Sequence, residues 1–596
     1  PIYRLLKTNA MLNRLFDVPY HQLKNFPQAN MFNTKVDSQW QSLSTQEFLQ
    51  QSMRLSKALY HMGVAAGDRI AVASSNRYEW NVLDIAVQQV GAILVPLYPT
   101  ISAKDYAYIL NDCAAEYMFV GNQEIADKIN EVKPQLSGLK EVFSFDSLPN
   151  VQSWNVLFEM QHEVSELMVQ ERMDAVKPED MVTIIYTSGT TGNPKGVMLT
   201  HGNVLSNVLA CEEPIPADKN SKVLSFLPVC HIYERMLHYL YMYIGASIYF
   251  AESMETIGDN IREVKPDVFS AVPRLIEKVY DKIIAKGEDL TGVKKKLFFW
   301  AVGLAEEYEQ TGKGSWYYLK LGIAKKLIFS KWQEALGGNV RAIASGSAAL
   351  QPRLARIFLA AGIPILEGYG LSETSPVVTV NSFDKGICFG SVGTLIEHVE
   401  VKIAEDGEIL VKGPNVMLGY YNNEEATNEV MDKDGWFHTG DIGVFIDKKF
   451  LKITDRKKEI FKTSGGKYIA PQAMENKFKE SRFIEQLIVV GEGEKFPGAF
   501  IVPSFLFLKE WALQNNLNFD TISNEEIVLQ EKVLLKFKEE IDEINEFFGS
   551  WEQLKKFVLL PKEFSIDGGE LTPTLKLRRK KIMEKYQKEY AILYGN

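Results

Sequence analysis

The stretch YTSGTTGNPKG (186–196) combines glycines, hydroxyl side chains and one lysine, and it is the most chemically distinctive part of the sequence. The β-branched, apolar residues 182–186 predict a buried strand that stops at the glycines. Thr200 and residues 203–210 predict the start of a helix. Backbone N–H groups of a glycine-rich loop can converge on an anion because no Cβ blocks the approach. With the hydroxyls and Lys195 as further donors, we predict that this loop binds phosphate.

Two other interpretations of this stretch compete with phosphate binding. A Walker A loop has the pattern GxxxxGK[ST], in which a hydroxyl follows the lysine and holds magnesium. Here Lys195 lies between Pro194 and Gly196, so that hydroxyl is missing and a P-loop kinase or ATPase is disfavoured. The plainer alternative is a flexible surface hairpin rich in Ser, Thr and Gly.

Three further stretches carry groups that could act in catalysis. EGYGLSETSP (367–376) offers the flat ring of Tyr369 to a base and the carboxylate of Glu373 to a magnesium ion. In GWFHTGDIG (435–443), Asp441 could accept hydrogen bonds from two adjacent hydroxyls, as on a ribose. ELTPTLKLRRKK (570–581) is a basic tail. Each also has an ordinary interpretation: a solvated loop carboxylate, a turn aspartate and a solvated charged surface.

Length and composition describe a multi-domain globular protein. The 596 residues suggest about three or four structural units. Net charge is −10, which argues against nucleic acid as a partner. The four cysteines show no CxxC spacing, which favours a reducing compartment, and we expect a cytoplasmic protein. The first residues do not resemble a signal peptide, and no apolar run is long enough for a membrane span. The longest apolar run, 236–250, predicts a buried helix, a turn and a strand.

Strand-like and helical segments alternate along most of the chain. Strand-like runs occur at 69–74, 92–98, 116–121 and 223–228. This alternation predicts α/β layers with largely parallel sheets. Residues 282–337 break the pattern, because they are helical in propensity and rich in lysine and aromatic residues. We expect an inserted helical hairpin that packs on the surface, with contact to a membrane as the alternative.

A separate α+β domain is predicted after residues 451–461. Two short strands are expected in EQLIVVGE and AFIVPS. One long helix is expected to begin at a capping box formed by Ser523 and Glu526 and to end at Gly549. Its predicted buried face is Leu534, Phe537, Ile541, Ile544 and Phe548.

Taken together and in this order, the motifs resemble those of the adenylate-forming superfamily, and most closely the long-chain fatty acid–CoA ligases. The resemblance runs from about residue 30 to the C-terminus, and residues 435–471 are similar to the fatty-acyl-CoA synthetase signature. It implies an α/β fold with a large multi-layer N-terminal domain (1–455) of two sheets flanked by helices, plus a small β-barrel-like subdomain. A mobile α+β C-terminal domain (456–596) would follow.

The resemblance also implies roles for individual residues, with ATP and CoA as co-substrates, Mg²⁺ as cofactor and a long-chain fatty acid as substrate. The β- and γ-phosphates of ATP would be held by Thr187, Ser188, Gly189, Thr190, Thr191, Gly192 and Lys195. The adenosine and α-phosphate would be held by Gly346, Ser347, Ala348, Tyr369, Gly370, Ser372, Asp441 and Arg456. Glu373 would bind Mg²⁺, and Ser464, Gly465 and Gly466 would line the pantetheine path.

Four residues would govern the reaction and its access. Lys576 would contact the carboxylate and α-phosphate during adenylation, and His231 would lie between the acyl and nucleotide pockets. Lys458 would be the hinge about which the C-terminal domain rotates. Some relatives have an aromatic gate where this chain has Arg235, so we expect an acyl tunnel lined partly by 227–250 and closed by Arg235 or by the helical insertion.

Some alternatives stay open at this point. A fatty acyl-AMP ligase that loads a carrier-protein thiol would share the first step. A catalytically inactive lipid-binding relative is disfavoured, because no structural need explains Lys195, Glu373, Asp441, Arg456 and Lys576 together. The sequence leaves the oligomeric state open, with a homodimer as one alternative, and it leaves open peripheral contact with the inner face of a membrane.

Overall fold

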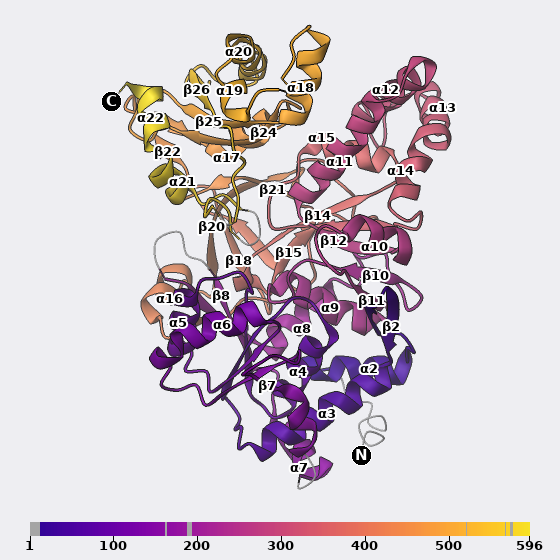
Figure 1. Ribbon diagram of the computed structural model, residues 1–596, viewed down its shortest axis with the longest axis vertical. Coiled ribbons are helices and arrows are strands. Elements are labelled where there is room, and N and C mark those ends of the chain that lie inside the picture. Colours follow the sequence, from indigo (N-terminus) through magenta and orange to yellow (C-terminus); the bar gives the residue numbers. More distant parts are fainter. Residues whose placement is uncertain are drawn as a thin grey trace.

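Two large, mostly parallel sheets form the body of the protein, as the alternating pattern predicts. The structure is a computed structural model that describes residues 12–160, 164–187, 193–519, 521–566, 568–572 and 576–595. Figure 1 shows the body below and a smaller C-terminal part above it.

The first sheet has eight strands in the order β19-β9-β8-β4-β3-β5-β6-β7. Its strands are β3 (Arg69–Ala73), β4 (Ile93–Leu97), β5 (Tyr117–Val120), β6 (Glu141–Ser144), β7 (Gln152–Ser153), β8 (Met181–Thr187), β9 (Lys195–Thr200) and β19 (Gly419–Tyr420). Parallel pairing runs from β8 to β7, whereas β8–β9 and β9–β19 are antiparallel. The predicted strand at 182–186 is therefore confirmed as part of β8, and Thr200 caps the predicted helix, α8 (His201–Ala210).

The second sheet has nine strands in the order β16-β15-β14-β13-β12-β10-β11-β1-β2. Its strands are β1 (Phe32–Val36), β2 (Gln39–Leu43), β10 (Lys222–Ser225), β11 (Ser247–Phe250), β12 (Val268–Ala271), β13 (Ala342–Ser345), β14 (Ile365–Gly370), β15 (Val377–Val380) and β16 (Thr394–Leu395). The predicted helix–turn–strand at 236–250 is confirmed as the end of α9 (Ile232–Ile244), a turn at Gly245 and β11. Gly245 has φ +83°, and a Cβ there would lie 2.6 Å from the Phe26 side chain, so the turn requires glycine.

A third, antiparallel sheet of four strands forms the predicted small subdomain. Its order is β17 (Glu400–Ile403), β18 (Glu408–Lys412), β20 (Phe437–Ile446) and β21 (Phe450–Arg456). Leu451 in β21 also exchanges backbone hydrogen bonds with Val392 and Gly393, so the outer edge of this sheet is joined to the segment before β16. The antiparallel pairing of β20 with β21 places Asp441 directly opposite Arg456.

Helices cover the sheets of the body. They are α2 (Val18–Asn25), α3 (Thr45–His61), α4 (Tyr78–Gln89), α5 (Ala103–Asp112), α6 (Gln123–Val132), α7 (Glu166–Ala175), α8, α9, α10 (Ile257–Val264), α11 (Pro273–Glu288), α12 (Gly292–Glu306), α13 (Ser315–Ala324), α14 (Ser330–Ala335), α15 (Pro352–Ala360) and α16 (Glu424–Val430). The predicted helical insertion at 282–337 is confirmed, but its first helix, α11, begins earlier, at Pro273, where proline is favoured in the first turn. Figure 1 shows α12 to α14 projecting from the body beside the C-terminal part.

The C-terminal part follows β21 and is an α+β unit, as predicted. Its strands are β22 (Phe461–Lys462), β23 (Tyr468–Ile469), β24 (Ile484–Val490), β25 (Gly498–Pro503) and β26 (Lys556–Leu559). Its helices are α17 (Pro471–Phe478), α18 (Phe505–Gln514), α19 (Asn524–Ile527), α20 (Glu531–Asn545), α21 (Arg579–Lys585) and α22 (Gln587–Tyr594). We call the described residues 457–595 the C-terminal segment.

The prediction of a single long helix after Ser523 is wrong, because the structure has two helices there. The capping box is present, but it caps only the short α19, and a second helix, α20, begins at Glu531. Phe537 and Ile541 are buried as predicted, whereas Leu534 is exposed, because the buried face of α20 runs through Val533, Phe537 and Ile541 at four-residue spacing and Leu534 lies beside it. Among the described residues, no helix is both long and apolar enough to cross a membrane.

Candidate active site

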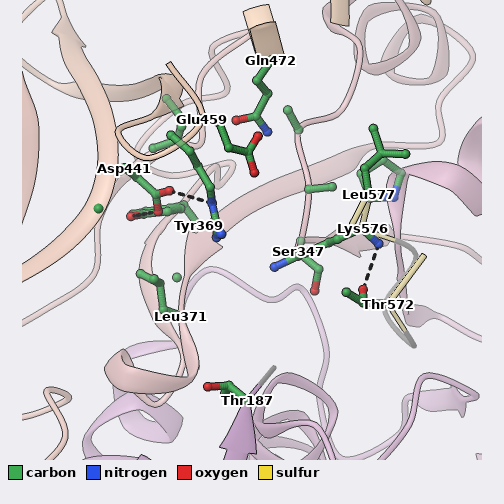
Figure 2. Close-up of a pocket in the computed structure, with 18 of the residues that line it drawn as sticks. Thr187, Ser347, Tyr369, Leu371, Asp441, Glu459, Gln472, Thr572, Lys576 and Leu577 are labelled. Carbon is green, nitrogen blue, oxygen red and sulfur yellow. Dashed lines mark hydrogen bonds and ion pairs between the residues drawn. The ribbon is translucent and has the colours of Figure 1, made fainter. Parts of the chain in front are cut away.

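A cavity of about 2390 Å³ lies between the body and the C-terminal segment. The carboxyl ends of the parallel strands β8, β13 and β14 open into it, which is where ligands bind in open α/β sheets. Figure 2 shows Thr187, Ser347 and Tyr369 from the body and Lys576 from the C-terminal segment around this pocket. Most of the predicted site residues that the structure describes therefore line one cavity.

Tyr369, Asp441 and Arg456 form a connected group on one wall. Tyr369 ends β14, and its hydroxyl donates to Asp441 Oδ2 at 2.7 Å. Arg456 Nε lies 3.1 Å from Asp441 Oδ1, across the β20–β21 pair. Burial, and then the Asp441 charge, raise the pKa of Tyr369 well above its usual value, so the phenol stays protonated. The ring is held in place, and the Asp441 carboxylate keeps free lone pairs that can accept further hydrogen bonds.

The backbone beside Tyr369 is tightly constrained. A Cβ on Gly370 would lie 1.8 Å from the Pro376 carbonyl oxygen, so only glycine fits at this β-bulge. Gly346, Ser347 and Ala348 follow β13 and line the cavity opposite. Ser347 has φ +73°, a left-handed conformation that is uncommon for residues other than glycine.

The glycine-rich stretch connects β8 to β9, and Thr187 pairs with Lys195 at its base. Ser188, Gly189, Thr190, Thr191 and Gly192 lie outside the described residues. Thr187 and Lys195 both line the cavity. The antiparallel pairing of β8 and β9 thus brings the two ends of the glycine-rich stretch together at the edge of the candidate site.

Lys195 and Glu373 meet at Tyr420, a residue that the motifs did not single out. Lys195 Nζ lies 5.0 Å from the centre of the Tyr420 ring, and the Tyr420 hydroxyl donates to Glu373 Oε1 at 2.8 Å. Tyr420 is placed there because β19 pairs with β9. Ser372, beside Glu373, is buried and also lines the cavity. A cation and a carboxylate therefore face the cavity side by side.

His231 caps the N-terminus of α9. Its Nδ1 accepts from the Tyr233 backbone N–H at 3.1 Å, which leaves Nε2 as the protonated nitrogen of the neutral ring. Burial, and then the nearby Lys576 charge, lower the pKa of His231 to about 4, so the ring is neutral near pH 7.

Lys576 enters the same cavity from the C-terminal segment. Its backbone N–H donates to Thr572 Oγ1 at 3.0 Å (Figure 2). Burial, and then the charge of Arg456, lower the pKa of Lys576 to about 8, while Asp441 and Glu373 act in the opposite direction. The structure therefore places a lysine of low pKa among the groups predicted to hold adenosine and metal.

The two other predicted elements of the C-terminal segment lie differently. Lys458 is the second residue after β21, where the chain leaves the body, and it lines the cavity. The turn Ser464–Gly466 joins β22 to β23, is exposed and does not line the cavity. Gly466 has φ +74°, which the turn requires. Lys576 thus lines the cavity and the turn does not, and the role of the turn in the pantetheine path stays a prediction.

The expectation that Arg235 closes an acyl tunnel is wrong. Its side chain is 1% exposed, pairs with Asp84 of α4, and lies over the Trp80 ring. The reason is helical geometry: Arg235 and Tyr239 lie one turn apart on the face of α9 that packs on α4, and the Tyr239 hydroxyl also donates to Asp84.

Only the first turns of α9 line the cavity. His231, Tyr233, Met236 and Leu237 do so, whereas residues 238–250 are buried away from the cavity, apart from the half-buried Tyr243. Cys211 and Ile215 contribute further apolar lining beside them. The cavity therefore has an apolar wall next to His231. Fewer residues of the segment 227–250 contribute to it than we expected, because the lining ends at Leu237.

Glu408 is a second residue that sequence reasoning missed. It is buried in β18, accepts from the Gly440 backbone N–H at 2.9 Å and pairs with Lys457 Nζ at 2.8 Å. These two contacts hold Gly440, which precedes Asp441, and the side chain of Lys457, which precedes Lys458. The available signal was a charged residue, Glu408, directly before the apolar run Ile409–Val411.

Comparisons with known proteins agree with this geometry. The sequence family described as "AMP-binding enzyme" matches residues 20–421, and "AMP-binding enzyme C-terminal domain" matches residues 458–596. The chain is 34% identical over 576 residues to the long-chain-fatty-acid–CoA ligase FadD15 of Mycobacterium bovis, covering 96% of this chain and 95% of that protein. It is 32% identical to long-chain-fatty-acid–CoA ligase 5 of Rattus norvegicus, covering 94% and 85%.

A solved structure shares the fold. The crystal structure of the anthranilate CoA ligase AuaEII in complex with anthranoyl-AMP matches with a TM-score of 0.72 at 18% identity, covering 96% of this chain and 97% of that one. At this identity the match supports the fold alone.

Proposed function

The chain belongs to the AMP-binding enzyme family, and from its nearly full-length similarity to long-chain fatty acid–CoA ligases we propose that it is one of them. It activates a long-chain fatty acid with ATP to acyl-AMP and pyrophosphate. It then transfers the acyl group to CoA, giving acyl-CoA and AMP.

Two steps are needed because a carboxylate is a poor acylating agent. Direct attack by a thiol would have to expel oxide. In the first step a carboxylate oxygen attacks the α-phosphorus of ATP, and pyrophosphate leaves with the electrons of the broken P–O bond. In the second step the CoA thiol loses its proton and attacks the acyl carbon, and AMP leaves. No protein nucleophile is required, but negative charge on the phosphoryl oxygens must be stabilised.

In the proposal, the wall around Tyr369 holds the adenosine. The Tyr369 ring stacks on adenine, and Asp441 and Arg456 hold the ribose hydroxyls. The hydrogen bond from Tyr369 to Asp441 and the ion pair from Arg456 support this, because both side chains are fixed before the nucleotide arrives. Gly346 to Ala348 lie on the facing wall, and the backbone at Gly370 and the hydroxyl of Ser372 border the α-phosphate.

The phosphate end is assigned to the base of the β8–β9 hairpin. Thr187 and Lys195 lie there, and residues 188–192 complete the loop in the sequence. Lys195 lines the cavity, and its Nζ lies 5.0 Å from the centre of the Tyr420 ring.

Magnesium is assigned to Glu373. Mg²⁺ in nucleotide sites is usually held by one or two carboxylates plus phosphate oxygens and water. Within the described residues no group of three His, Cys, Asp or Glu side chains could hold a metal, so a single carboxylate fits this mode better than a protein cage. When bound, the ion would neutralise charge on the phosphate oxygens. Tyr420 orients the Glu373 carboxylate by its hydrogen bond.

The observation that carries the proposal is the position of Lys576. It reaches the cavity from the C-terminal segment and lies near His231, Asp441 and Glu373. A cation there can neutralise the fatty carboxylate and the α-phosphate as they approach each other. The apolar wall at Tyr233, Met236 and Leu237 is assigned to the first part of the acyl chain.

Product analysis tests this function. With palmitate, ATP and CoA we expect AMP, pyrophosphate and palmitoyl-CoA in equal amounts. ADP instead of AMP would contradict it, and acyl-AMP without acyl-CoA would favour a ligase that loads a carrier-protein thiol. Across acetate, octanoate and palmitate we expect kcat/KM to rise with length, by up to ~0.8 kcal/mol per buried CH₂. The highest value with acetate would contradict the long-chain assignment.

The proposal also includes a cytoplasmic enzyme in peripheral contact with a membrane. The four cysteines are free, and three of them are buried, which suits a reducing compartment.

A further inference from the structure

The helical insertion has an apolar outer face that nothing in the described structure covers. Trp316, Leu319, Ile323 and Leu327 recur at helical spacing along α13 and the π-helical turn Lys325–Phe329 that follows it. Their exposed fractions are 67%, 55%, 46% and 46%. We call these four residues the outer stripe. Scattered exposed apolar residues are normal, but four on one continuous helical face mark an interaction surface.

The helix already has a packed face, so the outer stripe is not its core side. Leu321, Ala324, Phe329 and Trp332 are buried and belong to the core that includes α12 and α15. The insertion is thus a packed helix unit, as expected from its sequence. In Figure 1, α13 lies on the outer edge of the molecule, with α12 between it and the C-terminal segment.

Lysines predominate around the outer stripe, and the exposed Glu334 of α14 lies just beyond it. Residues 310–333 contain Lys313, Lys320, Lys325, Lys326 and Lys331 and no Asp or Glu, in a chain of net charge −10. Lys313 pairs with Glu307, whereas the other four lysines form no ion pair with any described residue. Lys320 Nζ lies 5.6 Å from the centre of the Trp316 ring. The nearby acids Glu306 and Glu309 are paired with Arg353 and Arg356 of α15.

This combination fits a lipid surface. A narrow stripe of tryptophan and aliphatic side chains can enter the boundary between headgroups and acyl chains. Lysines beside it can extend along the apolar surface and place their charges at anionic headgroups. A protein partner would be expected to meet a groove or a broader patch, and the stripe is a single convex helical face.

We propose that α13 and the π-helical turn bind the surface of an anionic phospholipid membrane through the outer stripe and its unpaired lysines. The four apolar side chains enter the interface, and Lys320, Lys325, Lys326 and Lys331 contact the headgroups. The body and its cavity stay in water.

Vesicle flotation with the full chain and no substrates tests this inference. One vesicle preparation is phosphatidylcholine, and the other is an equimolar mixture of phosphatidylcholine and phosphatidylglycerol. We expect binding to the mixed vesicles that weakens with added salt. The variant W316S/L319S/I323S/L327S should bind them about tenfold or more weakly. K320E/K325E/K326E should lose roughly fivefold per lysine and lose the salt dependence.

The matched control is L529S/L534S/L535S, which removes three exposed leucines from the C-terminal segment. It should bind vesicles as the unmodified chain does. All variants should keep the far-UV circular dichroism and the octanoate-dependent release of pyrophosphate, because none of these residues lines the cavity.

Three outcomes would overturn the inference. These are no binding of the unmodified chain to mixed vesicles, equal binding by the stripe variant, and equal binding to both vesicle types. Self-association of the unmodified chain without lipid, abolished in the stripe variant, would assign the stripe to a second copy of the chain instead. Since binding is measured without substrates, the outcome is independent of the proposed ligase activity.

Discussion

At the scale of single residues, Tyr420 joins two charges that the motifs treat separately. It donates to Glu373 and lies against Lys195, which belong to motifs about 180 residues apart. The carboxylate is therefore oriented by a hydrogen bond, and Glu373 lies half-buried in a single 3-10 helical turn, Ser372–Thr374, not in the core.

We predict that Glu373→Gln releases pyrophosphate about 100-fold more slowly, because a charged metal ligand is lost while the shape is kept. The unfolding temperature should change little, since the side chain is not core packing. Pyrophosphate release against Mg²⁺ concentration measures this. An unchanged rate and an unchanged Mg²⁺ dependence would exclude the metal role. Tyr420→Phe is a useful companion, which should weaken the Mg²⁺ dependence more mildly.

A pH dependence follows from Lys576. Its pKa is lowered to about 8, so the side chain carries its charge below pH 8 and loses it above. We expect kcat/KM for acyl-AMP formation, which reports the free enzyme, to be level below pH 8 and to fall as the pH rises further. Lys576→Arg keeps its positive charge above pH 8. In this variant the decrease of kcat/KM above pH 8 should disappear, even if the maximum rate falls. If kcat/KM of Lys576→Arg still decreased above pH 8, the decrease would have to come from the titration of another group.

Which site residues could be predicted depended on how local their signals are. Lys195, Tyr369, Glu373 and Asp441 lie in short motifs, and the structure brings them into one cavity. Tyr420 and Glu408 have no local signal beyond a tyrosine after glycine and a charge in a strand. They reach the site through strand pairing, which a single sequence does not display.

At the scale of elements, the contact between α4 and α9 gives Arg235 a structural role. Its guanidinium pairs with Asp84 inside the core, where Tyr239 also donates to the same carboxylate. A buried charge that loses its partner is strongly destabilising.

We therefore predict that Arg235→Met lowers the free energy of unfolding by about 3–5 kcal/mol. The relative rates with octanoate and palmitate should not change, because the residue is not at the cavity. Urea unfolding and the two-substrate comparison measure this. The control Arg262→Met removes an exposed arginine that pairs with Asp259, and it should have little effect. A changed chain-length preference with unchanged stability would restore the gate hypothesis.

Elements were predictable where periodicity was strong. The strands at 69–74, 92–98, 116–121 and 223–228 are all present. Their ends are shifted by at most one residue, except that the last strand ends three residues early, at Ser225. The strand β9 was missed, because Lys195 to Thr200 looks like a loop running into a helix and becomes a strand by pairing with β8 and β19. The break between α19 and α20 was missed because the apolar spacing continues across it.

At the scale of the whole molecule, the helical insertion also supports the C-terminal segment. Arg274 of α11 pairs with Glu485 of β24, and its Nη2 lies 3.8 Å from Glu563. Arg482 lies 3.6 Å from Glu288 at the end of α11. These ion pairs join the two parts in the arrangement that holds Lys576 in the cavity.

We predict that Arg274→Glu slows acyl-AMP formation at least about tenfold by opposing Glu485 in this arrangement. Conversion of supplied acyl-AMP and CoA to thioester should be retained. The double variant R274E/E485R should recover most of the lost rate. Lys282→Glu makes the same charge change at an exposed position of α11 and is the control. Equal loss in the control, or no recovery in the double variant, would show that the ion pair does not position the segment.

We propose that the two half-reactions use two different faces of the C-terminal segment at the same cavity. Lys576 faces the cavity, whereas the turn at Ser464–Gly466 is exposed away from it. Lys458 lies where the chain leaves the body. Rotation of the segment about this residue would exchange the two faces between the steps.

The most direct test of this account measures both half-reactions in Lys576→Ala and Lys458→Pro. Lys576→Ala should fail to form acyl-AMP from palmitate and ATP, yet convert supplied palmitoyl-AMP and CoA to palmitoyl-CoA at close to the unmodified rate. Lys458→Pro should do the reverse, because a proline fixes φ at the hinge and keeps one arrangement. Equal loss of both half-reactions in both variants, or normal thioester formation in Lys458→Pro, would contradict it.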